Sequence, residues 1–151
     1  YENMAAFAAA GEVLGSSAEA RAFFSTFSPA AFTALRPKSP ADRYDLAALA
    51  NQPGQVLEIA VRNLGNYANF DAADYETRLN DFLGVLAQQP GFVAEYQWVS
   101  VLDANIVVGM TVYESAEAFQ ALAGNQALLA AMMPFVQTYP PFTGYIHADA
   151  R

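Results

Sequence analysis

The apolar pattern of residues 55–148 is the feature that most limits how this chain can fold. Runs rich in Val, Ile, Leu and aromatic residues are typical of strands, and they occur at 55–64, 92–102, 106–113 and 143–148. Apolar residues spaced three and four apart are typical of amphipathic helices and occur at 71–88, and Ser115 predicts the start of a second helix at 115–133. The predicted order is therefore strand, helix, strand, strand, helix, strand.

This order predicts an α+β fold of the ferredoxin-like β-α-β-β-α-β type. Four antiparallel strands would form one sheet, and both helices would cover one of its faces. Asp103-Ala104-Asn105 predicts a tight turn between the two central strands, and Pro134 predicts the end of the second helix. The first and third strands are apolar on both sides, as in Ile106-Val107-Val108, so we expect the second sheet face to be buried as well.

Residues 1–38 share short matches, in the same order, with the end of the chain. The matches pair Tyr1-Glu2 with Tyr113-Glu114, Ala6-Phe7 with Ala118-Phe119, and Phe32-Thr33 with Phe142-Thr143. We therefore expect residues 1–38 to be the C-terminal part of a first ferredoxin-like repeat, 39–54 a connector and 55–151 a complete domain. The first strand, first helix and hairpin of the first repeat would then be missing from this chain. The alternative is a chance similarity in a helical arm rich in Ala and Phe.

Composition excludes several classes of function. The chain has 7 Lys and Arg residues against 15 Asp and Glu residues, so it lacks the clustered cations with which proteins bind nucleic acids or anionic membranes. It has no cysteine, which excludes disulfides, zinc ribbons, iron–sulfur clusters and thiol catalysis. No apolar run approaches the roughly 18–20 residues of a membrane span, and no signal peptide opens the chain. We expect a cytoplasmic protein with no nucleic-acid or membrane partner.

Short motifs in the second part of the chain resemble the antibiotic biosynthesis monooxygenase family. They are Pro90-Gly91-Phe92, which leads from the first helix to the second strand, and the run Tyr113-Glu114-Ser115 followed by Glu117-Ala118-Phe119. The resemblance implies two ferredoxin-like units packed sheet to sheet into a dimeric α/β barrel, formed by a homo-oligomer or by a second repeat. It also implies a pocket between each sheet and its helices. Better-known members of the family oxygenate phenolic or quinol-like molecules with O₂ and without metal or flavin.

The chain departs from the residue patterns of that family. Where cofactor-free members tend to carry Asn, Trp and Tyr, this sequence has Gly109, Tyr113 and Phe119. Haem-degrading members place a ligating His on the second helix, and residues 115–133 contain none. The resemblance therefore carries over the fold but neither catalytic set, and we expect neither a cofactor nor a metal.

Three residues are candidates for catalysis. Arg62 and Asn63 close the first strand and could hold a phenolate or enolate, because Arg donates as a fixed fork and Asn both donates and accepts. The alternative for both is a solvated strand end followed by a turn. Glu58 lies four residues before Arg62 on the same strand face, so the two could pair inside the barrel, where a lone charge is costly. The third candidate, Tyr113, would contact the substrate ring.

Four further residues are candidates for substrate binding: Tyr96, Trp98, Phe119 and His147. Aromatic side chains with polar tips suit a flat ring, and an imidazole suits a base near neutral pH. Their structural alternatives are core or interface packing for the aromatic residues and an exposed or hydrogen-bonded terminal position for His147. The sequence thus predicts a cofactor-independent monooxygenase-like protein that oxygenates a small aromatic molecule. The alternative is a non-catalytic small-molecule-binding or pairing module of the same fold.

Overall fold

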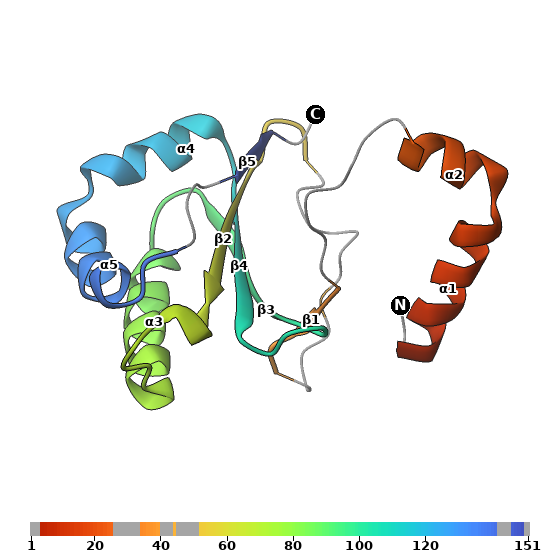
Figure 1. Cartoon of the computed structure of the whole chain (residues 1–151). Coiled ribbons are helices and arrows are strands. Elements are labelled where there is room, and N and C mark those ends of the chain that lie inside the picture. The colour runs from red at the N-terminus through yellow and green to blue at the C-terminus, as the bar shows by residue number, and fades with distance from the viewer. Residues whose placement is uncertain (1–3, 26–33, 40–43, 45–51, 142–145, 150–151) are drawn as a thin grey trace. The chain divides into compact units, whose positions relative to one another are not determined.

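In the computed structural model (Figure 1), the described residues are 4–25, 34–39, 44, 52–141 and 146–149. The chain divides into two compact units, Tyr1–Phe32 and Thr33–Arg151. The first unit contains helices α1 (Met4–Ser16) and α2 (Ala18–Ser25). The matched pairs Phe32-Thr33 and Phe142-Thr143 lie outside the described residues, so the internal repeat stays a prediction.

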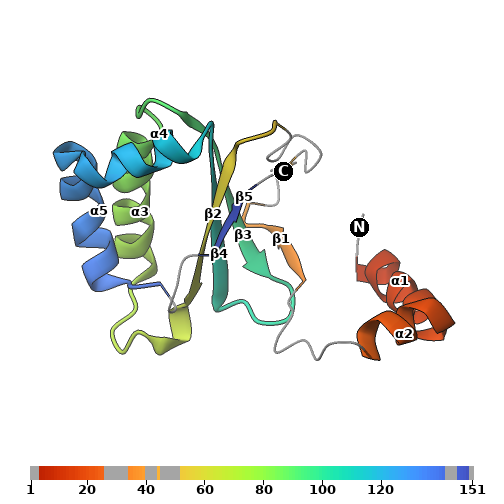
Figure 2. The ribbon, with the colours of Figure 1, turned by 90° about the horizontal axis from the view of Figure 1, so that it is seen from above.

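The second unit is built on a five-stranded antiparallel sheet with the strand order β1-β3-β4-β2-β5. Its strands are β1 (Leu35–Pro37), β2 (Val56–Asn63), β3 (Phe92–Ser100), β4 (Ile106–Tyr113) and β5 (Ile146–Asp149). Its helices are α3 (Ala72–Leu86), α4 (Ala116–Ala121) and α5 (Gln126–Thr138). The helices lie on one side of the sheet (Figure 2), so strands β2 to β5 with these helices confirm the predicted ferredoxin-like α+β fold.

Strand β1 extends the sheet beyond the four strands of the ferredoxin-like unit. It lies against the edge strand β3, with Leu35 opposite Ser100 and Pro37 opposite Trp98. The backbone N–H of Lys38 continues the pairing by donating to the Gln97 carbonyl over 2.9 Å. An edge position suits this segment because Pro37 has no N–H to donate to a second neighbour.

Helix α3 follows the predicted pattern. The Asp71 carboxylate caps its first turn by accepting hydrogen bonds from the backbone N–H groups of Ala73 and Asp74 over 2.8 and 3.0 Å. Its apolar stripe buries Tyr75 and Leu79 against the sheet. None of the helices within the described ranges is long and apolar enough to cross a membrane.

The predicted helix at 115–133 is wrong in two respects: it is divided, and it does not end at Pro134. Ser115 caps α4, and a 3₁₀ turn then leads to Asn125, whose side chain accepts from the Leu128 N–H over 3.0 Å and starts α5. Helix α5 continues through Pro134 to Thr138. A proline inside a helix costs about 3 kcal/mol. The buried face of α5, which includes the fully buried Phe135, offsets this cost.

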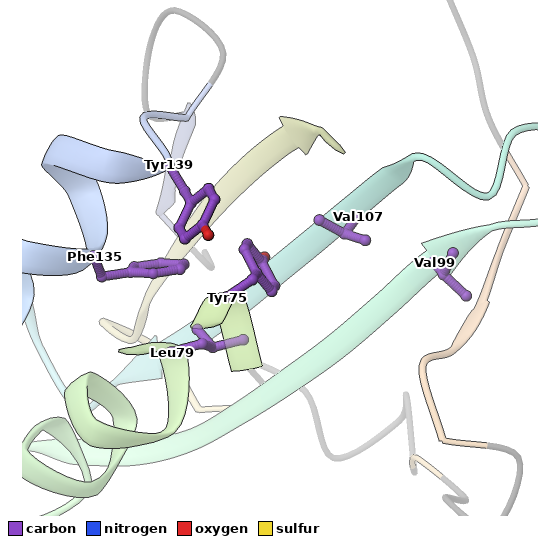
Figure 3. Close-up of a cluster of buried hydrophobic side chains, with 6 residues drawn as sticks. All are labelled: Tyr75, Leu79, Val99, Val107, Phe135 and Tyr139. Carbon is purple, nitrogen blue, oxygen red and sulfur yellow. The ribbon is translucent and has the colours of Figure 1, made fainter. Parts of the chain in front are cut away.

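The hydrophobic core lies between the helices and the sheet. One cluster joins side chains from both layers (Figure 3): Tyr75, Leu79, Val99, Val107, Phe135 and Tyr139. A second cluster contains Val56, Leu86, Tyr113 and Leu128. On the opposite sheet face, Trp98, Val108 and Val112 are also buried. Both faces therefore hold buried side chains, as the apolar pattern of the strands predicts.

Candidate functional site

A cavity of about 50 Å³ lies between the sheet and helices α3 and α5. The sheet lines it with five polar side chains, which we call the polar wall: Glu58, Arg62, Glu95, Gln97 and Thr111. The helices line it with six apolar side chains: Leu79, Phe82, Leu83, Met132, Phe135 and Val136. Alternate residues of a strand point to the same face, which explains how three neighbouring strands contribute polar groups to one cavity.

Glu95 is at the centre of a hydrogen-bonded group within the polar wall. One carboxylate oxygen accepts from the Gln97 side-chain amide, and the other accepts from the Thr111 hydroxyl. Burial, with a smaller contribution from nearby Glu58, raises the pKa of Glu95 to about 7. The hydrogen bonds from Thr111 and Gln97 and the charge of Arg62 act in the opposite direction and lower this pKa. The carboxyl group therefore exchanges its proton close to neutral pH.

Arg62 supplies the positive charge of the polar wall. Only 7% of the residue is exposed, and its Nε donates a hydrogen bond to the Tyr139 carbonyl over 3.0 Å. The guanidinium carbon lies 4.5 Å from the centre of the Phe135 ring, within range of a cation–π interaction. These contacts hold the guanidinium at the cavity, where its charge favours an anionic ligand group.

Tyr113 contacts the polar wall at Glu58. The Tyr113 hydroxyl donates a hydrogen bond to Glu58 Oε2 over 2.9 Å, and the residue is 2% exposed. Burial and the neighbouring Glu58 both raise the pKa of Tyr113 above its ordinary value. The hydroxyl thus stays protonated and serves as a hydrogen-bond donor to Glu58. The Tyr113 ring packs against Phe119, with ring centres 5.2 Å apart.

Gly109 leaves the space that the Glu95–Gln97 pair occupies. A Cβ atom at position 109 would lie 3.1 Å from Gln97 Nε2 and 3.2 Å from Glu95 Oε1, closer than ordinary van der Waals contact. The family resemblance points to an Asn at this position. In this chain the carboxamide beside position 109 is that of Gln97 on the neighbouring strand.

The structure places Asn63 and Phe119 away from the cavity. The Asn63 side chain accepts from the Gly65 N–H over 2.9 Å, as in the predicted turn, and lines a different hollow with Tyr67 and Pro140. Phe119 packs behind Tyr113 in the second core cluster and does not line the cavity. His147 lies on β5, opposite Glu58 in the strand register.

Tyr96 and Trp98 lie on the sheet face opposite the cavity. Both contact Tyr44 edge to face, with ring centres 5.0 and 4.8 Å apart. The Trp98 indole N–H is buried and has no hydrogen-bond partner among the described residues. The cavity therefore brings together Arg62 and, through Glu58, Tyr113, whereas Asn63, Tyr96, Trp98 and Phe119 do not line it.

Sequence reasoning missed Glu95, Gln97 and Thr111. For Glu95 and Gln97 the signal was two polar residues at alternate positions of one strand, which places them on the same face. Thr111 is a lone polar side chain on an apolar strand. Within the described ranges, no group of three or more His, Asp or Glu side chains could hold a metal ion.

Comparisons with known proteins agree with the fold of the second unit. Residues 71–133 match the family model described as antibiotic biosynthesis monooxygenase. SnoaB, a cofactor-independent oxygenase from Streptomyces nogalater, superposes with a TM-score of 0.55 at 17% identity, covering 65% of this chain and 94% of that one. A putative antibiotic biosynthesis monooxygenase from Caulobacter crescentus CB15 superposes with a TM-score of 0.53 at 22% identity, covering 66% of this chain and 92% of that one. No curated protein matches the sequence significantly.

These structural relatives share the fold at low identity, and the family match covers α3, the hairpin and most of the helices that follow. The second unit of this chain therefore has the fold of these proteins, and its residues 71–133 are similar to the antibiotic biosynthesis monooxygenase family.

Proposed function

We propose that the cavity binds a small phenolic or quinol-type molecule and that the domain oxygenates it with O₂ without a cofactor. The observation that carries this proposal is the polar wall, which places one guanidinium and two carboxyl groups at one side of an otherwise apolar cavity. An aromatic ring would contact Phe82 and Phe135, while its hydroxyl group would reach the polar wall. The similarity to SnoaB, a cofactor-independent oxygenase, supports the reaction class.

The substrate supplies the reactivity in this chemistry. Loss of a proton gives an electron-rich anion, which passes one electron to O₂, and the resulting radical and superoxide combine into a peroxide. Loss of water from that peroxide converts a CH₂ group and O₂ into a C=O group and H₂O. The protein has to bind the molecule, take up its proton and exclude bulk water. Arg62 is suited to hold the anion because its guanidinium is fixed by Tyr139 and Phe135.

The size of the cavity limits the ligand. Its volume of about 50 Å³ is well below the roughly 150 Å³ of a protein cavity that binds benzene. A ring can therefore enter only if the helix side of the cavity moves. Met132 is suited to this movement because its unbranched side chain changes rotamer easily.

The same volume supports a second candidate function. A domain whose cavity stays this small would be a non-catalytic binding or pairing module, with the polar wall kept as a buried network. Under this alternative, small aromatic molecules would not bind. Substitutions of polar-wall residues would then change the free energy of unfolding and no binding or catalytic property.

Oxygen uptake tests the first function against the second. We expect the purified protein to consume O₂ with an anthrone or hydroquinone in the absence of added metal or flavin, at a rate that rises with pH because the reacting species is an anion. Ala60→Leu would fill the cavity without changing a polar group and should abolish uptake. Uptake equal to that of buffer, or uptake unchanged in Ala60→Leu, would contradict the proposed oxygenase.

We also propose that residues 1–38 belong to a first repeat, and that a second repeat or a second copy of the chain packs on the sheet face around Trp98 and Val108. The support is the apolar sequence of strands β2 and β4, which continues on the face that α3, α4 and α5 leave open. Light scattering of the protein in solution tests this arrangement. A single chain with no second unit packed on the sheet would contradict it.

A further inference from the structure

We propose that Glu95 is the proton acceptor of the cavity: its carboxylate takes the hydroxyl proton of a bound phenol or quinol, and Arg62 holds the oxygen anion that forms. This role rests on the proposed function and assigns the base that the reaction needs. It concerns a residue that neither the composition nor the short sequence motifs indicate.

The placement of Glu95 meets the geometric requirement for a base. Its carboxylate lines the cavity, and Gly109 leaves the space that the side chains of Glu95 and Gln97 occupy. Gln97 and Thr111 each donate one hydrogen bond to a different oxygen, which fixes the orientation of the carboxylate. A carboxylate oxygen has two lone pairs, so each oxygen can still accept a second hydrogen bond from a ligand hydroxyl.

The charges around Glu95 suit a reversible proton transfer. From β2, Glu58 and Arg62 act on it in opposite directions. Tyr113 on β4 and Tyr75 on α3 also interact with it, and both hydroxyls stay protonated because burial raises their pKa values, for Tyr75 to about 12. A base works best when its pKa lies near the working pH, and burial raises the pKa of Glu95 to about 7.

Glu58, the other carboxylate of the polar wall, is less suited to this task. Its Oε2 already accepts the hydrogen bond of Tyr113. Glu95 accepts from an amide and an aliphatic hydroxyl, which do not lose their protons near neutral pH.

The proton transfer is balanced within the cavity. The O–H bond of the substrate breaks, an O–H bond forms on Glu95, and the electron pair stays on the substrate oxygen. One negative charge moves from the carboxylate to the substrate, so the net charge of the cavity does not change. Protonated Glu95 can then return its proton to the peroxide from which water is lost.

Anaerobic binding separates this role from the oxygenase function, because no turnover is required. The probes are hydroquinone, which has hydroxyl protons, and its dimethyl ether, which has none. In the wild-type protein, we expect hydroquinone to bind about tenfold more tightly at about pH 8 than at about pH 6, because ionised Glu95 accepts its hydrogen bond. Binding of the dimethyl ether should not change over this range.

Glu95→Gln should remove the pH dependence of hydroquinone binding, whereas Glu114→Gln, which changes an exposed carboxylate, should keep it. The same pH dependence for both probes in the wild-type protein, or for hydroquinone in Glu95→Gln, would overturn the role of Glu95 and leave the binding cavity standing. Failure of both probes to bind the wild-type protein would overturn the proposed function and this role with it.

With O₂ present, Glu95→Gln should lower kcat by roughly 10²–10⁴-fold, the usual contribution of a general base. Glu95→Ala should be rescued by added formate, which can enter the space left by the side chain. A purely structural role predicts no rescue, so the absence of rescue in a folded Glu95→Ala variant would count against the proposal.

Discussion

The guanidinium carbon of Arg62 lies 4.5 Å from the centre of the Phe135 ring, so the positive charge of the cavity is held against an aromatic face. A flat guanidinium stacks on such a face, whereas a lysine ammonium does not, and the carbonyl of Tyr139 fixes its Nε. The exchange of Arg62 for Lys is therefore not conservative at this position.

Arg62→Ala should slow oxygen-dependent turnover by roughly 10²–10³-fold, if the effect resembles the loss of one oxyanion donor. Arg62→Lys should recover only part of this loss, because Lys keeps the charge but not the planar fork. Steady-state oxygen uptake measures both variants. Arg78→Ala is a matched control, since Arg78 pairs with Asp74 on the partly exposed face of α3 and should leave turnover unchanged. Equal turnover in Arg62→Ala and the wild-type protein would contradict the role of Arg62.

The buried carboxyl of Glu95 should make stability depend on pH. Burial raises its pKa from 4.5 to about 7, so the folded protein binds this proton more tightly than the unfolded chain does. The contribution of Glu95 to the free energy of unfolding is then largest below pH 4.5 and falls as the pH rises to about 7, by at most about 3 kcal/mol. Denaturant unfolding should show this fall in the wild-type protein and a smaller fall in Glu95→Gln. An unchanged fall in that variant would assign the effect to other groups.

Tyr113→Phe should destabilise the domain. The hydroxyl donates to Glu58 at a site with 2% exposure, and its removal leaves a carboxylate oxygen of Glu58 without this donor. We expect a loss of about 1–3 kcal/mol in the free energy of unfolding. Tyr96→Phe, on the opposite sheet face, is the control and should change stability by less than about 0.5 kcal/mol. Equal effects of the two substitutions would mean that the bond to Glu58 contributes little.

Two glycine substitutions should have opposite effects. Gly109→Ala brings a Cβ within 3.2 Å of both Glu95 and Gln97, so the pair must shift and the protein should lose both stability and cavity function. In Gly84→Ala, on α3, the new Cβ has nothing within 4 Å. That variant should gain about 0.5–1 kcal/mol, because alanine favours a helix over glycine. Thermal unfolding measures both variants, and a stabilised Gly109→Ala would show that the pair moves without cost.

The sequence allowed the order of the elements to be predicted because their apolar periods are regular. It also allowed Glu58 and Arg62 to be placed on one face, since that inference needs only alternation within a single strand. The interruption before α5 is harder to predict, because Asn125 caps the helix within an apolar stretch and Pro134, which usually ends a helix, lies inside α5. The helix continues through Pro134 because the burial of Phe135 stabilises it, and this tertiary packing is not visible in the sequence.

The choice between Glu95 and Trp98 as cavity residues depends on a detail that the sequence does not reveal. The register of β3 shifts between Phe92 and Ala94, where an extra residue is accommodated. Phe92 faces the core, so without this shift simple alternation would turn Tyr96 and Trp98 toward the helices. With it, Glu95 and Gln97 face the helices instead.

The polar wall is built from three neighbouring strands, so the site forms only when these strands pair in the correct register. If one of these strands slipped by a single residue relative to its neighbours, every polar group that it contributes would move to the opposite face. A chain that pairs its strands wrongly would therefore be compact, but its cavity would lack the polar groups of the candidate site. For this domain, the folding step that aligns β2, β3 and β4 and the assembly of the candidate site are the same event.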